Sequence, residues 1–294
     1  MPGLVKPNKI LKNSKLFRII LSKFNNFILY YVFNEIIVSC KGSLYSYLFN
    51  LRSRILNYNS RVSFKSSSYK FVDLRIPELE WHAAHERHAS FTYIKGFYER
   101  IQDLEKSYML NLIDFKDDDL ILDCGANVGD LKLWSKIKKP NLRYVGFEPS
   151  PIEFKHLKKN ISPSKAYNVG LWNKNDQLTF YVSSQGGDSS LIKPLEYDEK
   201  IKVKTIRLEE FITQKIKLLK LESEGAEPEI LEGIGDKINN IQYITADLGF
   251  ERGLNEESTL VPVTNFLLNK NFELVEWTTH KRIAALYKNK NFIN

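Results

Sequence analysis

The sequence predicts an α/β fold in which a mostly parallel β-sheet carries helices on both faces. From about residue 117, short apolar segments typical of buried strands alternate with longer stretches of helical periodicity, as in parallel sheets. The last two strand-like segments, 272–279 and 282–289, follow each other without a helix and predict a C-terminal antiparallel hairpin. A helical segment precedes this domain. Ligands of such sheets bind at the carboxyl ends of the strands, so a site is expected there.

The individual elements follow from the length and periodicity of the apolar segments. Strands are predicted for the short apolar segments 120–123, 144–148, 166–171, 178–183, 216–222 and 241–249. Helices are predicted for the longer segments around 131–137, 151–160, 227–234 and 258–270. Residues 77–114 are also predicted to be helical, because an apolar stripe recurs there at helical spacing: Phe97, Ile101, Leu104, Tyr108 and Leu112.

Three regions are predicted along the chain: an N-terminal helical arm (1–70), a helical cap (71–116) and the α/β domain (117–294). In residues 15–38 of the arm, apolar side chains recur at helical spacing: Leu16, Ile20, Phe24, Phe27 and Tyr31. Charged residues interrupt this stretch, which is therefore too short to span a bilayer. It either lies on a membrane surface or packs on the main domain. The polar, serine-rich residues 57–70 predict a linker.

The net charge of +8 comes from the arm. Residues 1–70 hold eight lysines and four arginines but one acid, Glu35, giving +11, whereas the remainder carries −3. This predicts contact with an anionic membrane or nucleic acid, the alternative being a merely solvated arm. There are only two cysteines, and no small-residue cleavage site follows the first apolar stretch. We therefore expect a cytoplasmic protein, peripheral to the inner face of the membrane if the arm binds there.

Two motifs at predicted strand ends indicate the ligand. In "LDCGANVGD", Gly125 and Gly129 are four apart, which is not the G-x-G-x-x-G spacing of dinucleotide binding. A glycine-rich turn lets the backbone approach a ligand, and Asp123 before it can orient a charged or hydroxyl-bearing group. Glu148 ends the next strand, in "YVGFEP", where a carboxylate commonly holds the two hydroxyls of a ribose. Together they predict a site for an adenosine with an amino-acid tail, which describes S-adenosylmethionine.

The chain resembles the FkbM family of S-adenosylmethionine-dependent methyltransferases. The resemblance rests on "LDCGANVGD", "FEPSPIEFKHLKKN", "NVGLWNKNDQLTFYVS", "GDSSLIKP" and "LLKLESEGAEPEILEG". It implies a Rossmann-like class I methyltransferase fold with a seven-stranded sheet. It also implies O-methylation of sugars, polysaccharides or secondary metabolites. The cofactor-binding residues that it implies are Asp123, Gly125, Asn127 and Gly129 at the methionine and ribose end, Glu148 with Pro149 at the ribose hydroxyls, and Asn168, Gly170 and Leu171 at the adenine.

Three carboxylates at the ends of predicted strands are the catalytic candidates: Glu222, Glu224 and Asp247. An alcohol must lose its proton as it accepts a methyl group, which a nearby carboxylate can promote. Glu222 is the first candidate for the base or acceptor-orienting group and Asp247 the second. Glu222 stands where the family usually has Asp in Lys-Ile-Asp-x-Glu-Gly. Glu227 is instead expected to stabilise the following helix, because an acidic side chain is favourable near the positive N-terminal end of a helix dipole.

The cluster "WHAAHERH" places His82, His85 and His88 at intervals of three, without a cysteine or a fourth ligand, so no metal site is expected. The histidines form an exposed helical face, or one of them reaches over the acceptor pocket. The chain lacks the Asn-Pro-Pro-aromatic tetrapeptide that base N-methyltransferases use. We therefore predict a hydroxyl of a sugar or polysaccharide precursor as acceptor. One alternative is RNA 2′-O-methylation, in which the basic arm would bind the RNA. The other is a cofactor-binding module without catalytic turnover.

Overall fold

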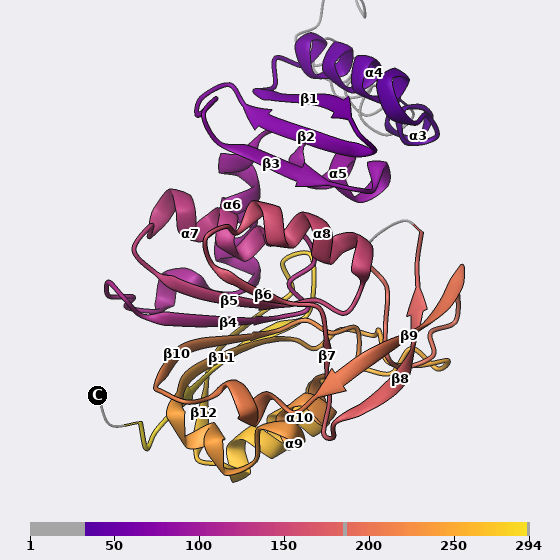
Figure 1. The fold of residues 1–294 in the computed structure, drawn as a ribbon. Helices are drawn as coiled ribbons and strands as arrows, with labels where there is room; N and C mark the ends of the chain where they lie inside the picture. Colours follow the sequence, from indigo (N-terminus) through magenta and orange to yellow (C-terminus); the bar gives the residue numbers. More distant parts are fainter. Residues whose placement is uncertain (1–32, 185–186, 293–294) are drawn as a thin grey trace, which may run out of the picture.

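The computed structural model describes residues 33–184 and 187–292 (Figure 1). Its centre is a seven-stranded sheet in the order β12-β13-β11-β10-β4-β5-β6. Five neighbouring strands are parallel: β4 (Leu120–Cys124), β5 (Arg143–Phe147), β6 (Lys165–Tyr167), β10 (Ile216–Leu221) and β11 (Ile241–Asp247). β13 (Ala284–Asn289) pairs antiparallel with both β11 and β12 (Phe272–Thr278). The predicted Rossmann-like sheet with its terminal hairpin is confirmed.

Helices cover both faces of this sheet (Figure 1). α7 (Asp130–Lys138) and α8 (Pro151–Asn160) lie on one face, and α9 (Glu227–Ile234) and α10 (Leu260–Asn269) on the other. Each face has its own core, with Leu131 and Leu157 in one cluster and Leu231 and Val263 in the other. All four helices were predicted, because each bears its apolar side chains on one stripe. Short 3₁₀ segments occur at Leu110–Leu112, Leu208–Phe211 and Gly235–Asn240.

A smaller sheet, in the order β7-β9-β8, contains β7 (Gly170–Leu171), β8 (Asp176–Val182) and β9 (Glu199–Ile206). The predicted strand 166–171 is therefore divided between two sheets. The sequence does not predict β9, "EKIKVKTI", because exposed lysines interrupt its few buried residues, Val203, Thr205 and Ile206.

Residues 33–107 form an α/β region, for which two sequence predictions are wrong. Its elements are α3 (Phe33–Val38), α4 (Gly42–Ile55), β1 (Ser60–Lys65), β2 (Ser68–Asp73), β3 (Glu80–Ala83), α5 (Glu86–Tyr93) and α6 (Phe97–Ser107). The predicted linker 57–70 belongs largely to the antiparallel hairpin of β1 and β2. Its turn places Ser66 and Ser67 at φ 52° and 56°, where glycine or asparagine is usual, so the residues give no hairpin signal. β3 lies within the segment 77–114 that was predicted to be helical.

This N-terminal region and the central sheet share one hydrophobic core. Tyr45, Phe49 and Trp81 have no exposed surface and belong to the same cluster as Ile121 of β4 and Leu133 of α7. The predicted boundary at residue 70 falls inside β2, so the described part of the arm packs on the main domain. Within the described ranges, no helix has both the length and the hydropathy needed to cross a membrane. The periodic residues of the arm lie outside the described residues: Leu16, Ile20, Phe24, Phe27 and Tyr31.

Candidate active site

A cavity of about 240 Å³ lies where β4, β5 and β10 end. Its wall is completed by α5 and α6 of the N-terminal region, by residues 187–191 and by side chains that follow β11 and β12. The cavity thus combines the strand ends that were expected to bind a ligand with segments distant in the sequence.

The turn between β4 and α7 contains two glycines with positive φ angles. Gly125 has φ +69°, and a Cβ there would lie 1.7 Å from the backbone oxygen of Glu222. Gly129 has φ +97°, and a Cβ there would lie 2.7 Å from Ile161 Cγ2. Close packing against the end of β10 and the end of α8 therefore requires both glycines. Gly125 also lines the cavity, whereas Gly129 does not.

Glu148 follows β5 directly, lines the cavity and has 6% of its surface exposed. Its Oε2 accepts a hydrogen bond from the backbone N–H of Asn127 (2.8 Å), and its Oε1 accepts one from that of Ser150 (2.8 Å). Burial, and then the neighbouring carboxylate of Glu153, raise the pKa of Glu148 to about 8. Each oxygen keeps a second lone pair, so the side chain can accept two further hydrogen bonds from a ligand.

The segment after Glu148 and the segment around β7 supply an apolar part of the wall. Pro149, Gly170 and Leu171 line the cavity. Asn168 does not line it. Its Nδ2 donates instead to the backbone oxygens of Glu148 (2.8 Å) and Pro149 (3.0 Å) and so holds this part of the wall in place. Further apolar lining comes from Phe147, Val169, Phe180 and Leu191.

Lys220 lies on β10 between two carboxylates and is 3% exposed. Its Nζ is 2.9 Å from Asp123 Oδ1 and 2.9 Å from Glu222 Oε2, and it donates to the backbone oxygen of Gly125 (2.8 Å). Burial alone would lower the pKa of Lys220, but Asp123 and Tyr108 together outweigh burial and the pKa is raised. Asp123 Oδ2 also accepts a hydrogen bond from Tyr144 (2.5 Å). Asp123 is therefore held by the protein's own donors.

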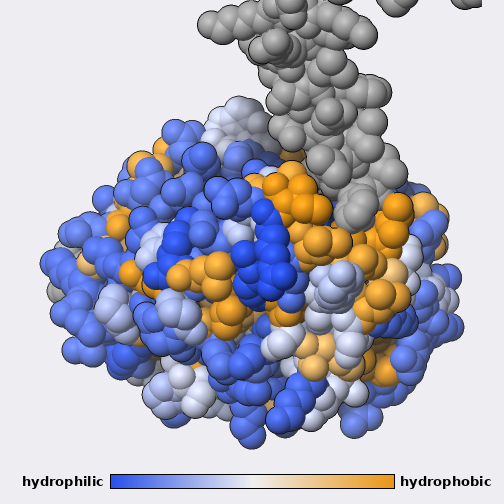
Figure 2. Space-filling model, turned by 90° about the horizontal axis from the view of Figure 1, so that it is seen from above, coloured by the Kyte–Doolittle hydropathy of each residue, from blue (hydrophilic) through white to orange (hydrophobic). Residues whose placement is uncertain are grey.

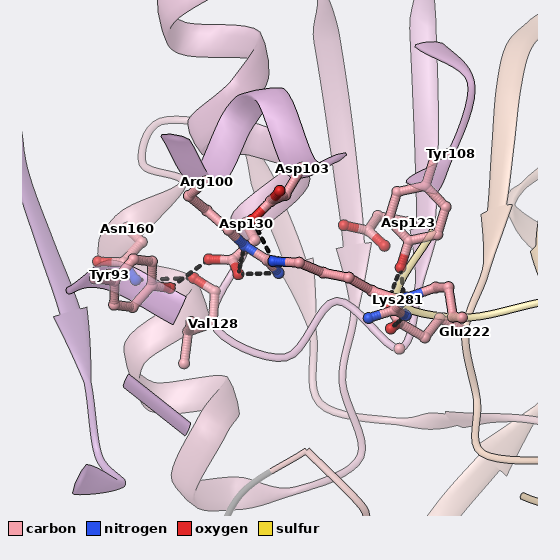
Figure 3. Close-up of polar contacts among 12 residues, drawn as sticks. Tyr93, Arg100, Asp103, Tyr108, Asp123, Val128, Asp130, Asn160, Glu222 and Lys281 are labelled. Carbon is pink, nitrogen blue, oxygen red and sulfur yellow. Dashed lines mark hydrogen bonds and ion pairs between the residues drawn. The ribbon is translucent and has the colours of Figure 1, made fainter. Parts of the chain in front are cut away.

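Arg282 lies between β12 and β13 and connects Glu222 with Asp247. Its Nη1 forms a short ion pair with Glu222, lies 2.8 Å from Asp247 Oδ2 and donates to the hydroxyl oxygen of Tyr108 (2.9 Å). The Tyr108 hydroxyl in turn donates to Glu222 Oε2 (2.5 Å; Figure 3). Asp247 is buried behind this network and does not line the cavity. Burial, and then Glu251, raise the pKa of Asp247 to about 7.

Glu224, Glu251 and Asp188 form an acidic part of the cavity wall. Burial, followed by the charges of Glu251 and Asp188, raises the pKa of Glu224 well above its ordinary value. Burial, followed by Glu227, raises that of Glu251 to about 7, and its side chain hydrogen-bonds to Glu224. Both carboxyls therefore hold their protons to higher pH than exposed glutamates do. Glu227 reaches back from α9, and its Oε1 accepts the backbone N–H of Ser223 (2.7 Å).

The three histidines do not lie on one helix. His82 is buried on β3, and its pKa is lowered to about 4, chiefly by burial. His85 precedes α5, and its Nε2 lies 2.6 Å from Glu153 Oε1. His88 lies on α5 and lines the cavity beside Gly187. In residues 33–184 and 187–292, no three His, Cys, Asp or Glu side chains are arranged to hold a metal ion.

The structure brings most of the predicted site residues together. Those that line the cavity are Asp123, Gly125, Asn127, Glu148, Pro149, Gly170, Leu171, Glu222 and Glu224. Those that do not line it are Gly129, Asn168 and Asp247. Sequence reasoning missed seven charged lining residues: Arg100, Asp130, Glu153, Asp188, Lys220, Glu251 and Arg282. A lysine inside the apolar segment 216–222 was a signal for Lys220, whereas the two arginines lie in segments without a motif.

Comparison with known proteins identifies the family. The model of the methyltransferase FkbM domain matches residues 123–280. Methyltransferase 1 of Beauveria bassiana is 27% identical over 163 residues, which cover 46% of this chain and 65% of that protein. The 2-O-methyltransferase NoeI of Sinorhizobium fredii is 23% identical over 184 residues, 54% of this chain and 74% of that protein. The solved structure of a methyltransferase FkbM from Methylobacillus flagellatus KT has a TM-score of 0.46 and 16% identity, covering 68% of this chain and 53% of that chain.

The chain spans just under two thirds of the Beauveria protein. The matched residues 123–280 make up more than half of the chain and include the ends of β4, β5 and β10 around the cavity. The resemblance noted in the sequence is thereby confirmed, and the chain belongs to the FkbM family of methyltransferases.

Proposed function

We propose that the protein transfers a methyl group from S-adenosylmethionine to a hydroxyl group of a sugar or polysaccharide precursor. The observation that carries this proposal is the buried carboxylate of Glu148, which faces the cavity at the end of β5 and is held by two backbone N–H groups. Family membership supports methyl transfer, and the printed name of NoeI places the acceptor atom of that relative on oxygen.

The lining residues fit the proposed donor. Glu148 would hold the two ribose hydroxyls through the acceptor positions that its backbone partners leave open. Val169, Leu171 and Phe180 provide an apolar surface for the adenine ring. When bound, the donor supplies an electrophilic methyl group, and the protein's contribution is to position the acceptor oxygen and to remove its proton.

We assign proton removal to the pair of Glu224 and Glu251. Glu222 is paired with Lys220 and Arg282, so its oxygens are already engaged by these cations. The pKa of Glu251 is raised to about 7 and its side chain is hydrogen-bonded to Glu224, so the ionised carboxylate of Glu251 can take the proton of an alcohol at physiological pH. Glu222 then holds Tyr108 and Arg282 at the cavity wall.

The acidic wall also supports a glycan over RNA as the acceptor. Each carboxylate of Asp188, Glu224 and Glu251 can accept hydrogen bonds from the hydroxyls of a sugar. The same charges repel the phosphates of RNA, whose binding requires a basic surface.

Peripheral contact with an anionic membrane is a further part of the proposal. α4 presents Leu44, Tyr47 and Ile55 to solvent, with 57%, 65% and 57% of their surfaces exposed. Figure 2 shows apolar residues gathered on this face of the molecule. Lys41 and Arg54 are exposed on the same segment, within the region that carries +11. Apolar side chains beside basic ones suit a membrane interface.

The acceptor can be tested by incubating the protein with S-adenosylmethionine that carries a carbon-13 methyl group. The panel contains glycans, nucleotide-linked sugars and RNA, and NMR and mass spectrometry locate the label. The proposal expects the label on a sugar oxygen. Label on nitrogen or on RNA ribose would contradict the proposed acceptor.

A further inference from the structure

S-adenosylmethionine ends in an α-amino acid, and a carboxylate that leaves water for a protein cavity needs a cationic partner. Three cationic side chains line the cavity: Arg100, Lys220 and Arg282. They differ in how many of their donors the protein already uses.

Lys220 and Arg282 are each neutralised by two carboxylates. Nζ of Lys220 forms ion pairs with Asp123 and Glu222 and donates to the backbone oxygens of Gly125 (2.8 Å) and Cys124 (3.4 Å). Nη1 of Arg282 is shared between Glu222 and Asp247, and its Nε is buried inside the protein. Nη2 of Arg282 takes no part in these contacts, but the charge of each side chain is already balanced by two carboxylates, so neither attracts a further anion as strongly as a cation with a single partner.

Arg100, on α6, is paired with one carboxylate only. Its Nε (2.8 Å) and Nη2 (2.6 Å) both donate to Asp130 Oδ2, while Tyr93 donates to the other oxygen of Asp130 (Figure 3). Across the part of the chain that the structure describes, Nη1 of Arg100 has no hydrogen-bond partner. The side chain is 15% exposed and lines the cavity. Asp130 thus fixes the guanidinium plane and leaves one edge of it available.

We propose that Arg100 binds the methionine carboxylate of the donor through Nη1. A guanidinium held in one plane by Asp130 is suited to a carboxylate, since its N–H donors have fixed directions. The inference rests on the proposed function, because it takes S-adenosylmethionine as the donor. Arg100 lies outside the residues 123–280 that match the family model. The N-terminal region therefore supplies part of the donor site in addition to sharing the core.

The test compares two ligands that have the same nucleoside. S-adenosylhomocysteine carries the amino-acid carboxylate, and 5′-methylthioadenosine lacks it. Arg100→Lys keeps a cation for Asp130 but loses the Nη1 donor. By calorimetry we expect the affinity of this variant for S-adenosylhomocysteine to fall about 10- to 100-fold. Its affinity for 5′-methylthioadenosine should fall less than about twofold. Arg87→Lys is the matched control, because Arg87 pairs with Glu35 on the surface and does not line the cavity.

A second variant is needed in case Arg100→Lys leaves Asp130 without a good partner and destabilises the protein. Arg100→Met combined with Asp130→Asn removes both buried charges together and keeps a polar partner for Tyr93. It should show the same selective loss. The inference is overturned if native-like binding of S-adenosylhomocysteine survives in both variants, or if both ligands weaken equally. If the native protein binds neither ligand, the proposed donor is wrong as well. Failure of the proposed function is thus distinguished from failure of the role of Arg100 alone.

Discussion

Single residues in the cavity differ in the charges beside them, and this decides which of them are available for chemistry. Glu222 has two cations, Lys220 and Arg282, as partners. Glu224 faces other carboxylates, and the described residues place no cation within ion-pair distance of it. The pKa of Glu224 is consequently raised well above its ordinary value, and that of Glu251 beside it is raised to about 7.

Glu224→Gln tests the role of this pair. We expect turnover to fall about 10²- to 10⁴-fold while donor affinity stays native, because a general base acts only on the reacting proton. In the native protein, kcat/KM should rise as the pH increases through about 7, since Glu251 must lose its proton before it can accept another. The measurement is the pH–rate profile with the acceptor that the labelling experiment finds.

In Glu224→Gln the remaining rate should still rise through about pH 7, because the Gln amide can still donate a hydrogen bond to Glu251, and Glu227 and Asp188 still raise the pKa of Glu251. Glu199→Gln, on the exposed strand β9, serves as the control. Native turnover in Glu224→Gln would place proton removal on another residue.

Whole elements of the central sheet were predictable because their signals are local. β4, β10 and β11 are short apolar segments, and the glycine-rich turn and the acid after β5 mark strand ends. The hairpin of β1 and β2 was missed because Ser66 and Ser67 occupy turn positions that glycine or asparagine normally fill. The ion pairs of Arg100 with Asp130 and of Arg282 with Glu222 join residues far apart in the sequence, so no local pattern predicts them.

Gly125→Ala tests the contact between the β4–α7 turn and β10. A Cβ would lie 1.7 Å from the Glu222 backbone oxygen, so the two elements must separate. We expect the free energy of unfolding, measured with urea, to fall by more than about 2 kcal/mol. Donor binding should also weaken, because Asn127 moves away from Glu148. Gly253→Ala is the matched control: φ there is +72°, but the nearest atom to a Cβ would be 3.6 Å away, so about 1 kcal/mol is expected. Equal losses would show that the turn absorbs the added carbon.

In the whole molecule, the N-terminal region both closes the cavity and exposes an apolar helix face. Deleting residues 1–70 would remove Tyr45 and Phe49 from the shared core, so such a truncation tests folding and not membrane contact. Substitution on the outer side of α4 separates the two properties.

The variant with Leu44, Tyr47 and Ile55 all changed to Gln should fold normally, because these side chains are exposed. We expect its binding to phosphatidylserine-containing vesicles, measured by sedimentation, to fall about tenfold or more, since it loses apolar contact area at the interface. Leu268→Gln with Trp277→Gln, two exposed positions outside the N-terminal region, is the control. Vesicle binding equal to that of the native protein would exclude α4 as the contact.

Donor binding through Glu148 is the point on which the proposed function depends most. Calorimetric titration of S-adenosylmethionine into the native protein and into Glu148→Ala measures it directly. Charge-assisted hydrogen bonds contribute roughly 1.5–3 kcal/mol each, so losing two of them should lower the affinity by about tenfold or more in the variant. Circular dichroism would confirm that the variant is folded. Equal affinities in a folded variant, or no binding by the native protein, would contradict the assignment of this cavity to S-adenosylmethionine.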